Sequence, residues 1–250
     1  MKRRRIKAIS FDGDMTLWDF QKAVRRSLAI VLTELQRRIP GRQTDQLTID
    51  MLIQIRNEVA CELKGTVASL EEVRLRAFQR TMEVMGRPDN ALASEMNTLY
   101  LEHRFRDIEL YPDVLPCLDA LRSRYVLGLL SNGNGYPDRC GLPDRFTFVV
   151  FAQDVGVEKP DAVMFHAACR QADCLPSELV HIGDSLESDV VGANGIGAVS
   201  VWLNRHGMQN DTSIIADYEV RSLTEFADIM GSGLGTADTG MQRTGLTHHR

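Results

Sequence analysis

Short apolar runs alternate with helical patterns along much of the chain. Five runs are rich in Val, Ile, Leu or Phe and show little polar alternation, and they lie at 6–11, 125–130, 146–151, 179–182 and 198–203. Strands covered on both faces have this pattern. Helical spacing precedes the second, fourth and fifth runs, at 114–124, 162–172 and 188–195. This order predicts an α/β fold whose core is a parallel sheet with helices on both faces.

One long segment, from about 19 to 107, lacks this alternation of strand and helix patterns. It contains no run that predicts a strand, and its apolar residues recur at helical spacing over 24–35 and 75–85. Pro and Gly punctuate it at 40–41 and 86–88. We therefore expect a helical insert after the first strand, with its Leu and Met stripes forming its own core.

The resulting organisation has four segments. Residues 1–18 carry the first strand of the core, 19–107 form the helical insert, and 108–230 carry the remaining strands. The segment 231–250 is rich in Gly, Thr and His and has few apolar residues. Such a composition predicts a disordered tail.

Composition narrows the classes of protein. The 250 residues carry a net charge of −5, which argues against a general binder of nucleic acid. No apolar segment approaches the roughly 18 residues of a membrane span. The five cysteines are odd in number and contain no C-x-x-C, which favours reduced thiols and a cytoplasmic location. We expect no nucleic-acid or membrane partner, and the oligomeric state is left open.

Asp12 and Asp14 directly follow the first apolar run. Ligands of open parallel sheets bind at the carboxyl edge of the strands, where these two carboxylates are expected to lie. A hard divalent cation, usually Mg²⁺, would neutralise the pair. Taken alone, however, two aspartates at this spacing also occur in ordinary surface loops.

Polar residues also follow three later strands. Ser131 and Asn132 suit an anion, although they would equally suit a turn. Lys159 would bring a cation to the same edge, and Asp184 could reach a metal. Asp189 could join them or could simply be an acidic residue in the first turn of a helix. Their joint occurrence at four strand ends is much less expected by chance than any single match.

In this order the motifs resemble those of the haloacid dehalogenase-like (HAD) hydrolase superfamily. The first motif is 12–17, the second Ser131-Asn132, the third Lys159-Pro160, and the fourth 183–185 with Asp189. The resemblance covers roughly 6–205. It implies a Rossmann-like core with an inserted α-helical cap domain of the C1 type. One departure is Met15, which stands where the family commonly has Gly.

The resemblance also implies catalytic roles. Asp12 would attack phosphorus and form an aspartyl-phosphate. Asp14 would protonate the leaving oxygen and then act as base toward water. Ser131, Asn132 and Lys159 would bind the transferring phosphoryl group.

The cofactor implied by the resemblance is Mg²⁺. Its ligands would be Asp12, the main-chain carbonyl of Asp14, and Asp184. Asp189 would not bind the ion directly but would orient these ligands or act through a water molecule.

These residues favour a phosphatase acting on a small phosphorylated metabolite. The acid at Asp14 disfavours a dehalogenase, whereas a sugar phosphomutase shares all four motifs. A phosphonate-cleaving enzyme would want a lysine in the cap, where only Lys22 and Lys64 occur. A phosphoacceptor signalling domain is the alternative from another class, although such domains are shorter. A dinucleotide-binding fingerprint fails, because Asp138 occupies the place of its third glycine.

Overall fold

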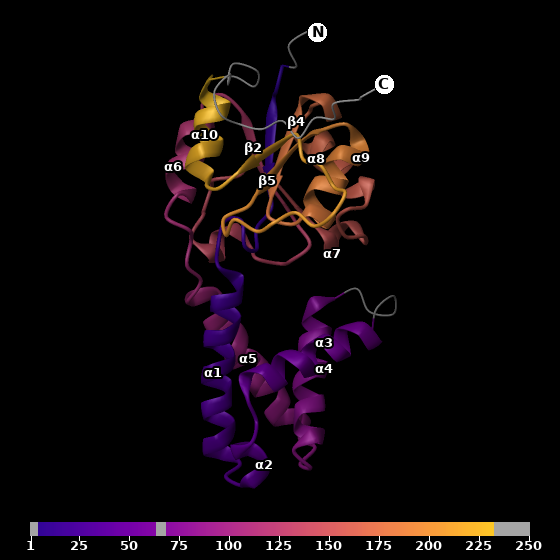
Figure 1. Ribbon diagram of the computed structural model, residues 1–250. Helices are drawn as coiled ribbons and strands as arrows, with labels where there is room; N and C mark the ends of the chain where they lie inside the picture. The colour runs from indigo at the N-terminus through magenta and orange to yellow at the C-terminus, as the bar shows by residue number, and fades with distance from the viewer. Residues whose placement is uncertain (1–4, 64–68, 233–250) are drawn as a thin grey trace. The chain divides into compact units, whose positions relative to one another are not determined.

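The computed structural model of the protein describes residues 5–63 and 69–232 and divides into two compact units (Figure 1). The first unit contains Met1–Trp18 and Leu110–Arg250, and the second contains Asp19–Glu109. The second unit thus ends two residues beyond the insert expected at 19–107. Gly231 and Ser232, expected in a disordered tail, complete a helix, and the rest of that tail lies outside the described residues.

The first unit is built on a six-stranded sheet in which each neighbouring pair is parallel. The strands are β1 (Ala8–Phe11), β2 (Val126–Ser131), β3 (Phe148–Phe151), β4 (Leu179–Gly183), β5 (Val199–Leu203) and β6 (Tyr218–Val220). Their order is β3-β2-β1-β4-β5-β6, which is the order of doubly wound nucleotide-binding sheets. The predicted α/β fold with a parallel sheet is therefore confirmed. The sequence did not predict β6.

Helices cover both faces of this sheet (Figure 1). On one face lie α6 (Val114–Leu121) and α10 (Leu223–Ser232), and on the other lie α8 (Ala162–Gln171) and α9 (Val191–Ile196). The Phe11 ring meets the Phe226 ring edge-on at 6.0 Å, which joins β1 to α10. Short helices at α7 (Ala152–Val155), Pro137–Cys140 and Pro176–Glu178 complete the connections.

The helix expected over 188–195 has a different beginning. A π-helical turn, Leu186–Val190, follows β4 and leads into α9. The Ser185 hydroxyl accepts from the Ser188 N–H at the start of this turn. A Cβ on Gly183 would lie 2.2 Å from the Asp189 carboxyl carbon, so a residue without a side chain is needed there. The turn thereby brings Asp189 back against the end of β4.

The second unit is helical and has its own core. Its helices are α1 (Phe20–Arg38), α2 (Arg42–Asp45), α3 (Ile49–Glu62), α4 (Leu70–Val84) and α5 (Asn90–Arg106). Side chains of Asp19, Thr48, Ser69 and Asp89 cap the first turns of the four long helices. The predicted Leu and Met stripes pack against one another in a buried cluster, which confirms that they form a core. Within the described residues, no helix has both the length and the apolar character to cross a membrane.

Candidate active site

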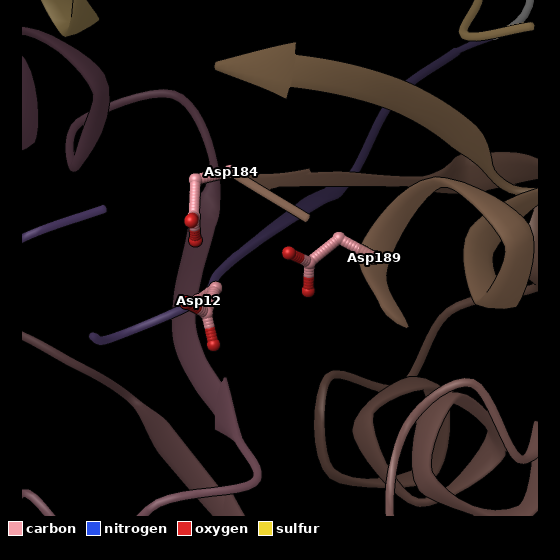
Figure 2. A group of neighbouring side chains, drawn as sticks. All are labelled: Asp12, Asp184 and Asp189. Atoms are coloured by element: carbon pink, nitrogen blue, oxygen red, sulfur yellow. The ribbon is translucent and has the colours of Figure 1, made fainter. Parts of the chain in front are cut away.

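The carboxyl ends of β1 and β4 meet at the point where the strand order reverses, which is where ligands bind in such sheets. Asp12 follows β1, Asp184 follows β4, and Asp189 returns from the π-helical turn. One carboxylate oxygen from each lies within 4.8 Å of the others. Figure 2 shows the three side chains grouped together, with the carboxyl group of Asp189 directed toward the other two. The fold therefore gathers three of the predicted aspartates in one place.

The buried ammonium group of Lys159 contacts two carboxylates of this cluster. Its Nζ donates to Asp12 Oδ1 at 2.6 Å, to Asp189 Oδ1 at 2.7 Å and to the Leu130 carbonyl at 2.8 Å. The Lys159 and Asp189 side chains are each only 2% exposed. Burial alone would lower the pKa of Lys159, but the charges of Asp12 and Asp189 outweigh burial and keep it above its ordinary value. Lys159 is therefore a fixed cation.

The carboxylates differ in their electrostatic environment. Burial acts to raise the pKa of Asp189, yet Lys159 and His181 outweigh it and hold that pKa below its usual range. Burial raises the pKa of Asp12 well above its ordinary value, against the opposing effect of Lys159. Burial and then the charge of Asp189 raise the pKa of Asp184 to about 6. The lysine thus compensates the charge of Asp189, whereas burial and neighbouring carboxylates disfavour the ionised forms of Asp12 and Asp184.

Ser131 and Asn132 lie at the end of β2, and their side chains form hydrogen bonds with different parts of the site. The Asn132 side chain holds the main chain of Lys159 at both ends: its Nδ2 donates to the Lys159 carbonyl at 3.0 Å, and its Oδ1 accepts from the Lys159 N–H at 2.7 Å. The buried Ser131 hydroxyl accepts from the Gly133 N–H at 3.1 Å. Ser131 Oγ also lies 3.4 Å from the position of a Cβ on Gly13, beside the loop of the first motif. Asn132 therefore positions the lysine.

The loop after Asp12 is tightly folded. The Gly13 carbonyl accepts from the N–H groups of residues 16, 17 and 18, and the Met15 N–H donates to the Trp18 carbonyl at 2.9 Å. Met15 has φ 64°, the left-handed region that favours glycine, which explains why a glycine is common in this place in the family that the motif resembles. The carboxylate of Asp14 is not in the cluster of Figure 2; its Oδ1 accepts from the Trp18 indole N–H at 2.7 Å.

A buried chain of hydrogen bonds runs behind the cluster through residues that the sequence did not assign to the site. His181 is buried within β4. Its Nε2 lies 3.0 Å from Asp189 Oδ1, and its Nδ1 lies 2.8 Å from the Ser10 hydroxyl. Burial lowers the pKa of His181 and so favours the neutral ring, in which a proton on Nε2 would donate to Asp189 and Nδ1 would accept from Ser10. A signal was present, because Ser10 and His181 are polar residues within otherwise apolar strands.

Two further residues hold Asp184. The Trp202 indole N–H donates to the Asp184 carbonyl at 2.9 Å, and the Thr16 hydroxyl donates to Asp184 Oδ1 at 3.5 Å. Neither residue was singled out from the sequence, because contacts between β5, the first loop and β4 depend on strand order. Both tryptophans of the chain thus donate their N–H groups to aspartates of the predicted motifs.

Known proteins resemble the chain over most of its length. A family model described as haloacid dehalogenase-like hydrolase matches residues 6–197. The glyceraldehyde 3-phosphate phosphatase of Methanopyrus kandleri is 30% identical over 240 residues, covering 90% of this chain and 97% of that protein. The N-acylneuraminate-9-phosphatase of Rattus norvegicus is 28% identical over 237 residues, covering 91% and 95%.

Solved structures give the same result. A 2-haloacid dehalogenase from Pseudomonas syringae has a TM-score of 0.77 at 30% identity, covering 91% of this chain and 99% of that one. A HAD phosphatase from Thermococcus onnurineus has a TM-score of 0.64 at 29% identity, with the same coverage. With the motif residues placed at one sheet edge, these matches show that the chain belongs to the haloacid dehalogenase-like hydrolase family.

Proposed function

We propose that the protein is a Mg²⁺-dependent phosphatase, a phosphoric monoester hydrolase that works through an aspartyl-phosphate on Asp12. The observation that carries the proposal is the bridge from Lys159 Nζ to Asp12 and Asp189 beside the carboxylate of Asp184. A carboxylate can attack an anionic phosphate only where fixed positive charge neutralises both. The relatives named as phosphatases of small phosphorylated metabolites support this substrate class.

The residues present fit a magnesium ion. The cluster offers carboxylate oxygens from Asp12, Asp184 and Asp189, and hard oxygen donors are what Mg²⁺ prefers. The raised pKa values of Asp12 and Asp184 indicate that Lys159 alone leaves negative charge uncompensated. Asp12, Asp184 and the main-chain carbonyl of Asp14 would hold the ion, with Asp189 supporting them. When bound, the ion would neutralise the negative charge of the phosphoryl group.

The chain's own residues can account for both half-reactions. An oxygen of Asp12 attacks phosphorus, the bond from phosphorus to the leaving oxygen breaks, and Asp14 gives that oxygen a proton. In the second step the Asp14 carboxylate takes a proton from the attacking water. As the water oxygen bonds to phosphorus, the bond between phosphorus and the Asp12 oxygen breaks, which releases inorganic phosphate and restores the Asp12 carboxylate.

The other motif residues position the phosphoryl group. Lys159 supplies fixed positive charge next to Asp12, and Asn132 keeps the lysine in place through its main chain. Ser131 and the N–H groups of its loop would bind the phosphoryl oxygens. We further propose that the helical unit Asp19–Glu109 is a cap domain. We also propose that the enzyme works in the cytoplasm, since all five cysteines are free thiols.

The nucleophile assignment is tested by Asp12→Asn, with Asp228→Asn on the exposed side of α10 as the matched control. Release of p-nitrophenol from p-nitrophenyl phosphate is measured with Mg²⁺ and with EDTA. We expect Asp12→Asn to abolish turnover, the control to retain it, and EDTA to silence the wild-type enzyme until Mg²⁺ is restored. Acid quenching during turnover should trap phosphate on the wild-type chain and on the control, but not on Asp12→Asn. Near-normal turnover by Asp12→Asn would overturn the assignment.

A dehalogenase is the second candidate, because one similar solved structure is named a 2-haloacid dehalogenase. Asp14 argues against it, since displacement of a halide needs no acid at this position. Chloride release from 2-chloropropionate, with no phosphate release from a panel of phosphorylated metabolites, would favour the dehalogenase. The panel would also separate the remaining alternatives: a phosphomutase would convert a sugar phosphate without net phosphate release, and a phosphoacceptor domain would turn over very slowly.

A phosphonate-cleaving activity has little support from the lysines of the helical unit. Lys22 is half exposed and forms an ion pair with Glu109 rather than lying in an apolar pocket. Schiff-base chemistry requires a neutral amine. Lys64 lies outside the described residues.

A further inference from the structure

Trp18 is fully buried and directs its only polar atom at the carboxylate of Asp14. Its relative exposure is 0%, and its Nε1 lies 2.7 Å from Asp14 Oδ1. The two residues are also joined through the main chain by a bridge within the same loop. An indole N–H can donate but cannot accept, so the oxygen that it contacts must be an acceptor.

Two glycines form the slot that holds the indole. A Cβ on Gly13 would lie 2.7 Å from Trp18 Cζ2, and a Cβ on Gly135 would lie 2.6 Å from the same atom. Real Cβ atoms do not come this close to another heavy atom, so a side chain at either position would push the ring aside. One glycine belongs to the first motif and the other to the loop after β2. The ring therefore packs closely against the main chain of both loops.

The other carboxyl oxygen of Asp14 faces a third glycine. Asp14 Oδ2 would lie 2.6 Å from a Cβ on Gly133, so the absence of a side chain at this position makes room for it. The torsion that orients an aspartate carboxyl group is broad and roughly two-fold. Such a torsion leaves the two oxygens equivalent unless a contact distinguishes them. The indole N–H breaks this symmetry.

We propose that Trp18 is a positioning residue for the carboxyl group of Asp14: its N–H holds Oδ1 and so assigns the transferred proton to Oδ2. This rests on the proposed function, in which Asp14 is the acid and then the base. As the bond from phosphorus to the leaving oxygen breaks, the proton passes from Oδ2 to that oxygen. The electron pair of the O–H bond stays on the carboxylate, whose charge the indole N–H stabilises through Oδ1. In the second step Oδ2 takes the proton from water.

The test uses two substrates that need the acid to different degrees. Phenyl phosphate and p-nitrophenyl phosphate are similar in shape, but phenolate is the more basic leaving group and depends more on protonation. The ratio of their kcat/KM values reports the step in which the leaving group departs. Trp18→Phe keeps an aromatic ring in the slot and removes the N–H. Asp14→Asn removes the acid itself, and Trp202→Phe removes the other indole N–H, which serves the Asp184 carbonyl.

We expect Trp18→Phe to lower kcat/KM for phenyl phosphate about tenfold more than for p-nitrophenyl phosphate, as a misplaced general acid should. Asp14→Asn should show the same selectivity more strongly, whereas Trp202→Phe should leave the ratio of the two substrates unchanged. An equal loss on both substrates in Trp18→Phe would show that the indole only fills space, and would overturn the inference. No selectivity in Asp14→Asn would instead overturn the acid role of Asp14, and the inference with it.

A second replacement covers poor folding of Trp18→Phe. Incorporating 3-benzothienylalanine at position 18 exchanges the N–H for sulfur and preserves the two-ring shape that Gly13 and Gly135 accommodate. Far-ultraviolet circular dichroism checks that the fold is retained. The same selective loss on phenyl phosphate is expected, and its absence in this folded protein would refute the role of the N–H group.

Discussion

Removing the amine of Lys159 should be far more costly than removing that of an exposed lysine. In Lys159→Met the chain keeps an unbranched side chain of similar length but loses the cation between Asp12 and Asp189. Three short hydrogen bonds disappear together, and two buried carboxylates face each other without compensation. Breaking a buried ion pair by removing one partner costs about 3–5 kcal/mol. In a chain of this size, each kcal/mol lowers Tm by about 2–4 °C.

Lys7→Met provides the control within the same unit. Lys7 pairs with Glu178 at 3.1 Å, but its side chain is 48% exposed. Exposed pairs contribute about 0–1 kcal/mol, so this variant should be close to the wild type. Both variants are unfolded in urea and by heat in the presence of EDTA, so that metal binding adds nothing to either. The reasoning is refuted if Lys159→Met, at neutral pH, loses no more stability than Lys7→Met.

Three further outcomes are expected. Burial raises the pKa of Asp184 to about 6, so as the pH falls this group takes up a proton at a higher pH in the folded state than in the unfolded chain. The metal-free protein should therefore be more stable at about pH 5 than at pH 7, by on the order of 1–2 kcal/mol. Thermal melts in EDTA should show this trend and should lose it when Mg²⁺ is added. His181→Leu should cost about 1–3 kcal/mol in urea unfolding, because Asp189 and Ser10 lose a buried partner, and His181→Gln should recover part of the loss. Met15→Gly should be neutral or stabilise by up to about 1 kcal/mol, since φ 64° strains a methionine, whereas Met15→Val should lower Tm.

The sequence predicted the parts of the fold that bury uniform apolar runs. The first five strands along the chain and the helices between them follow from such runs, and the parallel sheet and the HAD-like hydrolase family are confirmed. The strand β6 was not predicted, because three residues with Glu219 at the centre carry too little pattern. The predicted start of the helix near Asp189 was wrong, because a π-helical turn has no distinctive amino-acid composition.

The sequence predicted which residues form the candidate site, but it did not predict the hydrogen bonds that connect them. Four strand ends could be assigned to one edge because parallel strands share their polarity. That the Asn132 amide holds the Lys159 main chain, and that His181 supports Asp189, depends on the register and on side-chain torsions. Trp18 was missed because an apolar residue directly after a motif is usually interpreted as a core residue. Its N–H becomes informative only once the loop is seen to fold back on Asp14.

The second unit leaves and rejoins the first at neighbouring points of the main chain. Trp18 and Leu110 form an antiparallel bridge, and just beyond them the Asp19 N–H donates to the Glu109 carbonyl at 3.2 Å. A short turn could join Trp18 to Leu110 without altering the strand order of the sheet, because loop closure depends on the distance between the ends. The strand order of the sheet therefore does not depend on the length or the structure of the segment inserted between Trp18 and Leu110. During evolution the helical segment could be exchanged wholesale, while the residues that perform the chemistry stayed where they were.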